Sequence, residues 1–552
     1  MKLNRTFVSV LVGVMAVVAV SACSNDSSNE KNASPSGSAS QAGSPASSAA
    51  SAAGPIELTS VKMLDPNVTF ADGEDIENNI WTRAAKDEYG VTITYKWTAP
   101  SAQYSEKVAL MLATGDLPDF LQLDATGYEQ ALKAGLLADL TDAYEKYASP
   151  ALKERMMLDG GDALQAGMKD GKMYAVVQAN SWKTDSEQML YIRKDWLDKL
   201  NLEAPKTIDD VMRIAEAFTK QDPDGNNADD TIGLGMTLNN YFGFLNGNNA
   251  YRSIWMPDGS GNLVYSSIQP EMRDALLKLQ QMYKNGYIDP EFYTKGMDVV
   301  KTDITNGKIG MIYDNYVAPL NLMDSWDKDK NADWIVVPQP ALTEAEYPAK
   351  SEVKNGFSYY LVASKNIKNP EAFINMINLF VDKQSNDSSY VTDSEGRMVH
   401  NYAPANISTP DGNLYNQRLI AKAIESGDPE GLLTGSNTAQ AKQNYENVIR
   451  LQEGSTDKTD WGLGKIFGPE SSLSVLDQYY FTPAHYVKNE FYGAPTPAMV
   501  KYSATLNDLE DQTFTKIITG TSIDSFDKFV DNWHSLGGDE ITKEVNAFYQ
   551  SR

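Results

Sequence analysis

Two hydrophobic periodicities alternate along the chain after about Pro55, and they predict both strands and helices. In residues 91–97 the apolar or aromatic positions alternate with Thr and Lys, a period of two that is typical of a half-buried strand. Residues 75–89 before it form a predicted helix that Gly90 ends. Strands that alternate with helices in this way indicate an α/β fold built of layers.

Helical periodicity is clear in two later segments. Thr207 and Asp210 form a T-x-x-D capping box in front of residues 211–218, whose apolar members share one helical face. In residues 272–283, Met, Leu, Leu and Tyr recur at spacings of 4, 3 and 4, and Gly286 follows as a stop signal. No repeat of about 20–50 residues is present, which argues against a solenoid or propeller.

Residues 1–22 have the pattern of a signal peptide. Lys2 and Arg5 precede an apolar stretch over residues 7–20, which is shorter than the ~20 residues that span a membrane. Residues 20–23, Val-Ser-Ala-Cys, resemble the lipobox of bacterial lipoproteins, in which the cysteine after the cleavage point carries acyl chains such as palmitate. We therefore expect Cys23 to be the lipid attachment site. The alternative is an ordinary secretory signal in which this cysteine is incidental.

The segment that follows predicts a tether. Residues 24–54 consist almost entirely of Ser, Ala, Gly, Asn and Pro, from which no core can form. Residues 23–55 are thus a lipidated cysteine and a flexible linker, with a mean reach of roughly 30 Å. A globular body could stand off the membrane surface on such a linker.

Composition excludes several function classes. The net charge of −26 over 552 residues disfavours nucleic acid and anionic membrane surfaces as partners, so the lipid is the only membrane contact that we expect. One cysteine excludes a disulfide framework and a cysteine-rich zinc site. The three histidines are isolated from one another, which leaves little for a transition-metal cluster.

Six phrases of the mature chain are distinctive: VALMLATGDLPDFLQLD (108–124), DGKMYAVVQ (170–178), LYIRKDWLDKLNLEAPKTIDDV (190–211), SIQPEMRDALLKLQQMYKNGYIDPEF (267–292), NGKIGM (306–311) and FDKFVDNWHSLGGDEITKEVNAFY (526–549). In this order they resemble the extracellular solute-binding proteins of family 1, which are substrate receptors of sugar ABC importers. The phrases at 267–292 and 526–549 look like the large lipoprotein branch of that family, which includes LplA-like and alginate-binding proteins. The resemblance covers essentially all of residues 56–552.

This resemblance implies an α/β clam-shell of the periplasmic-binding-protein type II, with discontinuous lobes and an interlobe ligand cleft. The chain is expected to cross between the lobes near residues 176–178, near residues 356–359 and again in the last quarter. The lobes would close on the ligand about a hinge, and the transporter can sense this closure. The expected parts are lobe 1 at 56–177 and, approximately, 357–470, lobe 2 at 178–356, and a C-terminal helical segment at 471–552 that packs mainly on lobe 2.

An acidic loop, QDPDGNNADDT at residues 221–231, predicts a structural calcium site. Calcium binds six to eight oxygen ligands, and donors at alternate positions of a tight turn supply them. The expected ligands, at loop positions 1, 3, 5, 7 and 9, are Asp222, Asp224, Asn226, the carbonyl of Ala228, and Asp230.

The loop departs from the EF-hand pattern. Position 6 is Asn227 where Gly is usual, and position 12 is Gly233, so the bidentate glutamate is missing. The alginate-binding relatives also use position 10, which is Thr231 here. The alternative is a polar turn without a metal.

Sugar sites combine aromatic faces with planar polar groups. By their match to contact loops of the family, nine residues are candidates, and for each the alternative is a core or surface role. Asp119 and Trp196 are expected to be structural and Trp255 to pack in a hairpin, whereas Trp461 and Tyr492 could line the opening. The candidates are Gln122, Asp124, Asn180, Trp182, Asn240, Tyr241, Tyr313, Asn315 and Tyr316.

The predicted function is a monomeric, extracytoplasmic, lipid-anchored receptor that passes an oligosaccharide to ABC transporter permeases and has no enzymatic activity. Two alternatives stay open: a glycan-active enzyme such as a glycosidase or lyase, and a sugar sensor without transport. No nucleophile motif supports the enzyme. The acidic balance leans against polyuronates as ligands, although Lys or Arg residues inside the cleft would reverse this.

Overall fold

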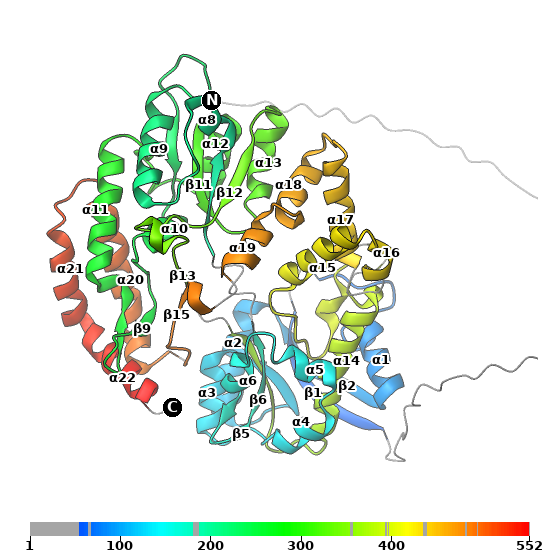
Figure 1. Ribbon diagram of the computed structural model, residues 1–552. Helices are drawn as coiled ribbons and strands as arrows, with labels where there is room; N and C mark the ends of the chain where they lie inside the picture. The colour runs from blue at the N-terminus through cyan, green and yellow to red at the C-terminus, as the bar shows by residue number, and fades with distance from the viewer. Residues whose placement is uncertain are drawn as a thin grey trace, which may run out of the picture. The chain divides into compact units, whose positions relative to one another are not determined.

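The computed structural model describes residues 55–64, 68–179, 187–353, 357–391, 393, 395, 397–433, 439–480, 483–493 and 495–550. Cys23 and the predicted signal peptide lie outside them. The described residues form two α/β lobes, each with its own sheet and core (Figure 1). No helix in these ranges is both long enough and apolar enough to cross a bilayer.

Lobe 1 is built on strands β1 (Ile56–Met63), β2 (Val91–Ala99), β3 (Phe120–Leu123), β6 (Ala175–Ala179) and β14 (Phe357–Ala363). β1 pairs with β2 in parallel, and β14 lies antiparallel between β3 and β6. The predicted strand at 91–97 is confirmed. The lobe also holds α1 (Ile80–Tyr89), α2 (Ser101–Thr114), α3 (Ala125–Lys133), α4 (Thr141–Tyr147), α5 (Pro150–Arg155), α6 (Asp162–Ala166), α14 (Pro370–Asn386), β4 (Met168–Lys169), β5 (Lys172–Met173), and 3₁₀ turns at Ser388–Tyr390 and Val399–Tyr402.

Local sequence fixes the ends of α1. The Asn79 side chain accepts hydrogen bonds from the first turn and Thr82 returns one to the Asn79 N–H, so a capping box starts the helix at Ile80. Gly90, at φ +66°, ends it in the left-handed conformation that favours glycine. The predicted helix at 75–89 was therefore right at its C-terminus and began too early.

Lobe 2 is built on a sheet in the order β12-β7-β11-β8. The strands are β7 (Met189–Arg193), β8 (Ile232–Gly235), β11 (Ile309–Asp314) and β12 (Trp334–Val337). Alternate residues of β7, and residues 311–313 of β11, enter two different cores, because successive side chains on a strand point to opposite faces. The other elements are α8 (Lys194–Leu200), α9 (Ile208–Lys220), α10 (Phe242–Gly247), α11 (Pro270–Lys284), α12 (Met297–Thr305), α13 (Pro319–Lys328), β9 (Trp255–Pro257), β10 (Leu263–Tyr265), and 3₁₀ turns at Ser266–Ile268 and Glu344–Glu346.

Two helical groups complete lobe 2. The first packs on the face of the sheet that carries Tyr191 and Ile312, and the second packs against α11 on the opposite face (Figure 1). The first group is α15 (Gly412–Ser426), α16 (Pro429–Leu432), α17 (Ala439–Gln452), α18 (Lys458–Phe467) and α19 (Ser472–Tyr480). The second is α20 (Pro497–Ile518), α21 (Ser525–Trp533), a π-helical turn at His534–Gly538 and α22 (Asp539–Gln550).

The predicted extent of lobe 1 differs from the structure in its second part. Residues up to Ile407 share the lobe 1 core, but those from Leu414 onward share the lobe 2 core with Trp334 and Ile309. The second part of lobe 1 thus ends near residue 407 and not near residue 470. The sequence of an amphipathic helix does not show which sheet it covers. The helices between residues 412 and 467 could therefore not be assigned to lobe 1 or lobe 2 from the sequence.

The chain passes between the lobes near the first two places that the resemblance implied, whereas the third passage comes before the last quarter of the chain. β6 belongs to lobe 1 and β7 to lobe 2, and the way back runs from β13 (Ser351–Val353) to β14. β13 pairs in parallel with β15 (Tyr486–Lys488), which follows a 3₁₀ turn at Pro483–His485. A third passage lies between Ile407 and Leu414.

Candidate functional site

Side-chain contacts join the strands β1 and β3 at one edge of lobe 1. Thr59 donates from its N–H and its hydroxyl to the Asp119 carboxylate (2.8 and 2.7 Å), and Ser60 Oγ donates to the carbonyl of Phe120 (2.9 Å). These contacts hold β1 beside β3, while β1 pairs through its backbone with β2. In α/β folds, ligands bind outside the carboxyl ends of the strands.

Two sugar candidates lie at this edge. Gln122 is partly buried near the end of β3, and its carbonyl accepts a hydrogen bond from the Tyr104 hydroxyl (3.0 Å). Asp124 is exposed and caps α3, with one carboxylate oxygen accepting from the Gly127 N–H (2.7 Å). Asp119, which holds β1 to β3, has the structural role that the sequence predicted.

Asn240 and Tyr313 are brought together in lobe 2, but inside its core. Asn240 is 3% exposed; its oxygen accepts from the Thr237 N–H (2.6 Å), and its amide nitrogen donates to the carbonyl of Tyr313 (3.2 Å). The Tyr313 ring packs against Gly243, where a β-carbon would lie 2.3 Å from it. Asn240 thus fixes the loop after β8, and in this arrangement a ligand does not reach it.

Tyr241 is also buried. Its hydroxyl accepts a hydrogen bond from Arg252 Nη1 (3.2 Å), and burial raises its pKa to about 12. Arg252 in turn binds Glu510 and Asp511 on α20. Tyr241 therefore belongs to the contact between the core of lobe 2 and its C-terminal helices.

The segment after β11 is fastened to the helical group on its own face. Tyr316 is buried; its hydroxyl accepts from Asn413 Nδ2 (2.6 Å), and its carbonyl accepts from Ser472 Oγ (2.6 Å). Asn315 is partly buried, and its side-chain oxygen accepts from the Val317 N–H (3.1 Å). Among the lobe 2 candidates that the structure describes, Asn315 is thus the most accessible.

The other aromatic and polar residues singled out in the sequence have the following positions. Asn180 and Trp182 lie outside the described residues. Trp196 is buried against Phe218, and Trp255 packs in the β9–β10 hairpin, as expected for structural residues. Tyr492 contacts Phe548 near the C-terminus and is tied to the second helical group.

A buried polar cluster that the sequence did not reveal lies next to the passages between the lobes. Gln339 Nε2 donates to the Glu187 carboxylate (2.8 Å) and to the carbonyl of Gln188 (2.7 Å), while the Gln339 N–H donates to the Tyr480 hydroxyl (2.6 Å). Burial, and then the neighbouring charge of Glu352, raise the pKa of Glu187 to about 8, against a hydrogen bond from Ser351 that lowers it. The carboxyl is therefore largely neutral at pH 7.

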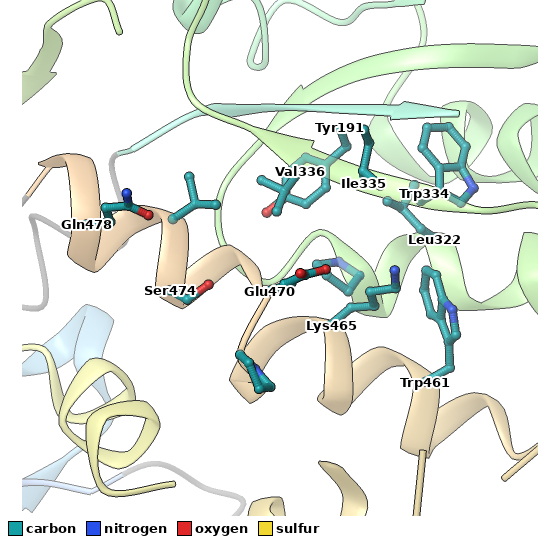
Figure 2. A pocket seen from close by; sticks show the side chains of 13 residues that line it. Tyr191, Leu322, Trp334, Ile335, Val336, Trp461, Lys465, Glu470, Ser474 and Gln478 are labelled. Atoms are coloured by element: carbon teal, nitrogen blue, oxygen red, sulfur yellow. The ribbon is translucent and has the colours of Figure 1, made fainter. Parts of the chain in front are cut away.

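Lobe 2 also contains a pocket of about 340 Å³ between its edge strand and the first helical group. Figure 2 shows Trp334 and Trp461 at one end, Gln478 at the other, and Lys465 and Glu470 between them. Trp461, which the sequence did not place, stacks on Trp326 and lines this pocket. Apolar walls with a few polar groups are typical of small-molecule sites.

The acidic loop 221–231 has part of the geometry that a cation needs. The N–H groups of Gly225, Asn226 and Asn227 all donate to Asp222, so the backbone turns around this carboxylate. Asn226 Nδ2 contacts Asp224 (2.7 Å) and Asp230 (3.0 Å), which places three predicted ligands around one point. Asn227 adopts the left-handed conformation (φ +59°) that position 6 requires.

Other features limit the fit of this loop to calcium. Thr231 at position 10 is buried and donates to the carbonyl of Phe218, so it is not a ligand. The Lys199 ammonium donates to the carbonyl of Pro223 (2.8 Å), and Lys308 lies 3.6 Å from Asp230. Burial, the hydrogen bond with Asp222 and the nearby carboxylates raise the pKa of Asp224, a repulsion that a divalent cation would relieve.

Comparison with known proteins gives consistent matches over most of the chain. The family model of bacterial extracellular solute-binding proteins matches residues 68–387. Lipoprotein LipO of Bacillus subtilis (strain 168) is 23% identical over 505 residues, which cover 89% of this chain and 92% of the relative. The polygalacturonan/rhamnogalacturonan-binding protein YtcQ of the same organism is 24% identical over 478 residues, or 82% of this chain and 85% of the relative.

A solved structure supports the fold. The ABC-transporter substrate-binding protein FusA of S. pneumoniae, as an EF-hand mutant in complex with fructo-nystose, superposes with a TM-score of 0.52 at 17% identity. The match covers 90% of this chain and 99% of FusA. The two-lobed arrangement is thus shared, although the sequences have diverged widely.

Proposed function

Because the chain belongs to the bacterial extracellular solute-binding proteins, we propose that it binds an oligosaccharide between its two lobes and delivers it to the permeases of an ABC importer. YtcQ is named as a polygalacturonan/rhamnogalacturonan-binding protein, and FusA as an ABC-transporter substrate-binding protein, seen in complex with fructo-nystose. On this proposal the protein changes no covalent bond of its ligand.

The observation that carries the proposal is the end of β3 in lobe 1. β1 is held beside β3, and on this proposal Gln122 and Asp124, partly buried and exposed at the end of β3, contact the ligand. An amide and a carboxylate are groups that bridge pairs of sugar hydroxyls. In lobe 2 the corresponding contribution comes from Asn315 after β11.

Two features complete the proposal. Cys23 carries the lipid that holds the protein at the outer face of the membrane, on the tether of residues 24–54. Calcium binds the loop 221–231 through Asp222, Asp224, Asn226, Ala228 and Asp230, where it would brace the segment between α9 and β8. FusA, a fold relative whose description names an EF-hand, supports a metal loop in this class of protein.

The proposal is tested by ligand binding to the purified full chain in detergent. A ligand that binds only the folded protein raises the melting temperature in proportion to the logarithm of its concentration. We expect such a rise with at least one oligosaccharide, and unchanged glycan in the same mixture by mass spectrometry. Cleaved glycan would show that the protein is an enzyme, and no rise with any oligosaccharide would refute the sugar receptor.

The anchor is tested separately in cells. The Cys23→Ser variant is expected to leave the membrane fraction, because serine has no thiol to form the thioether with diacylglycerol. A variant that stays in the membrane fraction would contradict anchoring at Cys23.

A further inference from the structure

The pocket inside lobe 2 is a feature that the proposed function does not use. Its walls come from β7, β12, α13, α18 and α19 and from the turn before α19, all of which belong to this lobe. Protein cores are close-packed, with few voids larger than a water molecule, so a gap of about 340 Å³ beside a core is unusual. Small-molecule sites begin at about 300 Å³. The pocket therefore has room for a single small molecule.

One end of the pocket is apolar. Figure 2 shows Trp334, Trp461 and Leu322 gathered there, and the two tryptophans are only 2% and 3% exposed. The Trp334 Nε1–H already donates to Ser325 Oγ (2.8 Å), so it is not available to a ligand. A sugar carries hydroxyls around its ring, and burial without partners makes such groups costly. An aliphatic or aromatic side chain needs no polar partner at this end.

Two opposite charges lie next to the apolar end. Lys465 on α18 and Glu470 in the turn before α19 both line the pocket between its two ends (Figure 2). The Lys465 ammonium lies 5.9 Å from the centre of the Trp461 ring, which places it at the border of the apolar end. Its distance to the Asp333 carboxylate is 3.5 Å, longer than an ordinary hydrogen bond. A ligand with one charge of each sign would therefore match this pair.

The edge of β12 brings backbone groups to the same pocket. Among the described residues, β12 is the outermost strand of its sheet, and the Lys194 N–H donates to the Asp333 carbonyl (2.7 Å) across the ladder with β7. Because hydrogen-bonded pairs alternate in an antiparallel ladder, the N–H and C=O groups of Trp334 and Val336 point to the outer edge. Ile335 packs on the opposite core and still lines the pocket, so the pocket reaches this edge.

We propose that this pocket binds a free α-amino acid with an apolar side chain. The side chain lies between Trp334 and Trp461, the carboxylate pairs with Lys465, and the ammonium pairs with Glu470. The outer edge of β12 offers further backbone donors and acceptors to the same two groups. Charge-assisted hydrogen bonds of both signs favour the zwitterion over a molecule with one charge. The site is separate from the ligand site proposed in lobe 1, so the protein takes two ligands of different classes.

Isothermal titration of the full chain in detergent tests the proposal with matched ligands. The probes are L-leucine, L-phenylalanine and L-tryptophan, each beside the amine that lacks the carboxylate and the acid that lacks the ammonium. For L-phenylalanine these are phenethylamine and 3-phenylpropionate. We expect at least one amino acid to bind about 10- to 100-fold more tightly than either of its analogues, the range for a hydrogen bond to a charged group.

Variants of the two charged residues separate recognition from a general effect on folding. With Lys465→Gln the amino acid should bind no more tightly than its amine, and with Glu470→Gln no more tightly than its acid. Each variant loses one preference and keeps the other, which a merely destabilised protein would not do. Lys442→Gln is the control: it removes an exposed lysine of α17, 3.9 Å from Glu430, and should leave all affinities unchanged. Thermal unfolding is measured for every variant.

The outcomes separate this inference from the proposed function. If none of the three amino acids binds, if the analogues bind as tightly, or if both variants keep both preferences, the amino-acid site is overturned and the sugar receptor is unaffected. Displacement of the amino acid by an oligosaccharide also overturns it, because the pocket would then belong to the sugar site. If an amino acid binds as expected and no oligosaccharide does, the proposed function fails and this site stands.

Discussion

The Glu187 carboxylate and the Gln339 amide share a 2.8 Å hydrogen bond at exposures of 1% and 0%. Glu187 comes directly after the first passage between the lobes, and its neighbour Glu352 directly before the second. A second interaction at this place, from the Gln339 N–H to Tyr480, reaches the first helical group. The interior of lobe 2 next to both passages therefore depends on a carboxyl group that is neutral.

This arrangement predicts that stability falls as pH rises. The pKa of Glu187 is about 8 in the folded protein, above its ordinary value of 4.5. Between these two pH values the folded state therefore binds more protons than the unfolded state. The free energy of unfolding then decreases from pH ~4.5 to ~8, by on the order of a few kcal/mol. Glu187→Gln removes the titration and keeps an acceptor for Gln339. We expect a flatter profile for this variant in urea unfolding at pH 5.5, 7 and 8.5.

The control is Glu203→Gln, which neutralises an exposed carboxylate after α8 and should leave the profile of the wild type unchanged. Parallel profiles for the wild type and Glu187→Gln would show that Glu187 is not the responsible group.

A buried ion pair predicts a large loss of stability. Arg252 Nε donates to Glu510 (2.6 Å), which is 2% exposed on α20, and the same guanidinium also binds Asp511, whose side chain is 56% exposed. Removing the buried partner leaves the guanidinium with only the solvated Asp511, and losing the buried half of such a pair costs about 3–5 kcal/mol. Glu510→Ala should lower the free energy of unfolding by this order, as measured with urea.

Asp511→Ala is the matched variant on the next residue. Because this carboxylate is solvated, its removal should cost less than about 1 kcal/mol. Equal losses of unfolding free energy for Glu510→Ala and Asp511→Ala would mean that burial does not determine how much each carboxylate contributes.

The sequence predicted local features well because short-range interactions determine them. The capping box of Thr207 and Asp210 forms as expected, with reciprocal hydrogen bonds at the start of α9. The alternation in residues 91–97 became β2, with one face buried and the other exposed. The family resemblance supplied the longer-range order of the lobes, which no local pattern contains.

The candidate site was harder to predict because exposure is decided by packing between distant segments. Asn240 and Tyr313 come at the ends of strands, as cleft residues do, but the loop after β8 turns both into the core. Tyr316 is covered by α15 and α19, about 100 to 160 residues later in the chain. No residue close to Tyr316 in the sequence indicates that these two helices bury it.

Close packing around one glycine predicts a further loss of stability. A β-carbon on Gly310 in β11 would lie 2.2 Å from the Phe218 ring and 2.7 Å from the Trp196 ring, both of which are buried. Overpacking of this kind costs about 1–3 kcal/mol. Gly310→Ala should lower the urea midpoint accordingly. Gly412→Ala, at the start of α15 with no atom near its β-carbon, should have no such effect, and equal midpoints for the two would refute the steric explanation.

The calcium loop gives a prediction that depends on metal. With calcium in excess over a chelator, the melting temperature of the wild type should rise, because a cation that binds only the folded protein stabilises it by about 2.7 kcal/mol at 100 times its dissociation constant. Asp222→Asn should abolish this rise, since Asp222 is the carboxylate around which the backbone of the loop turns.

Asp258→Asn provides the matched comparison for this loop. Asp258 also accepts two backbone hydrogen bonds in a turn, from Ser260 (2.7 Å) and Asn262 (3.0 Å), but it has none of the acidic neighbours of Asp222. Its substitution should lower the melting temperature equally with and without calcium. If Asp222→Asn behaves in the same way, the loop is a polar turn held by its own hydrogen bonds and by Lys199, and the metal is not part of this protein.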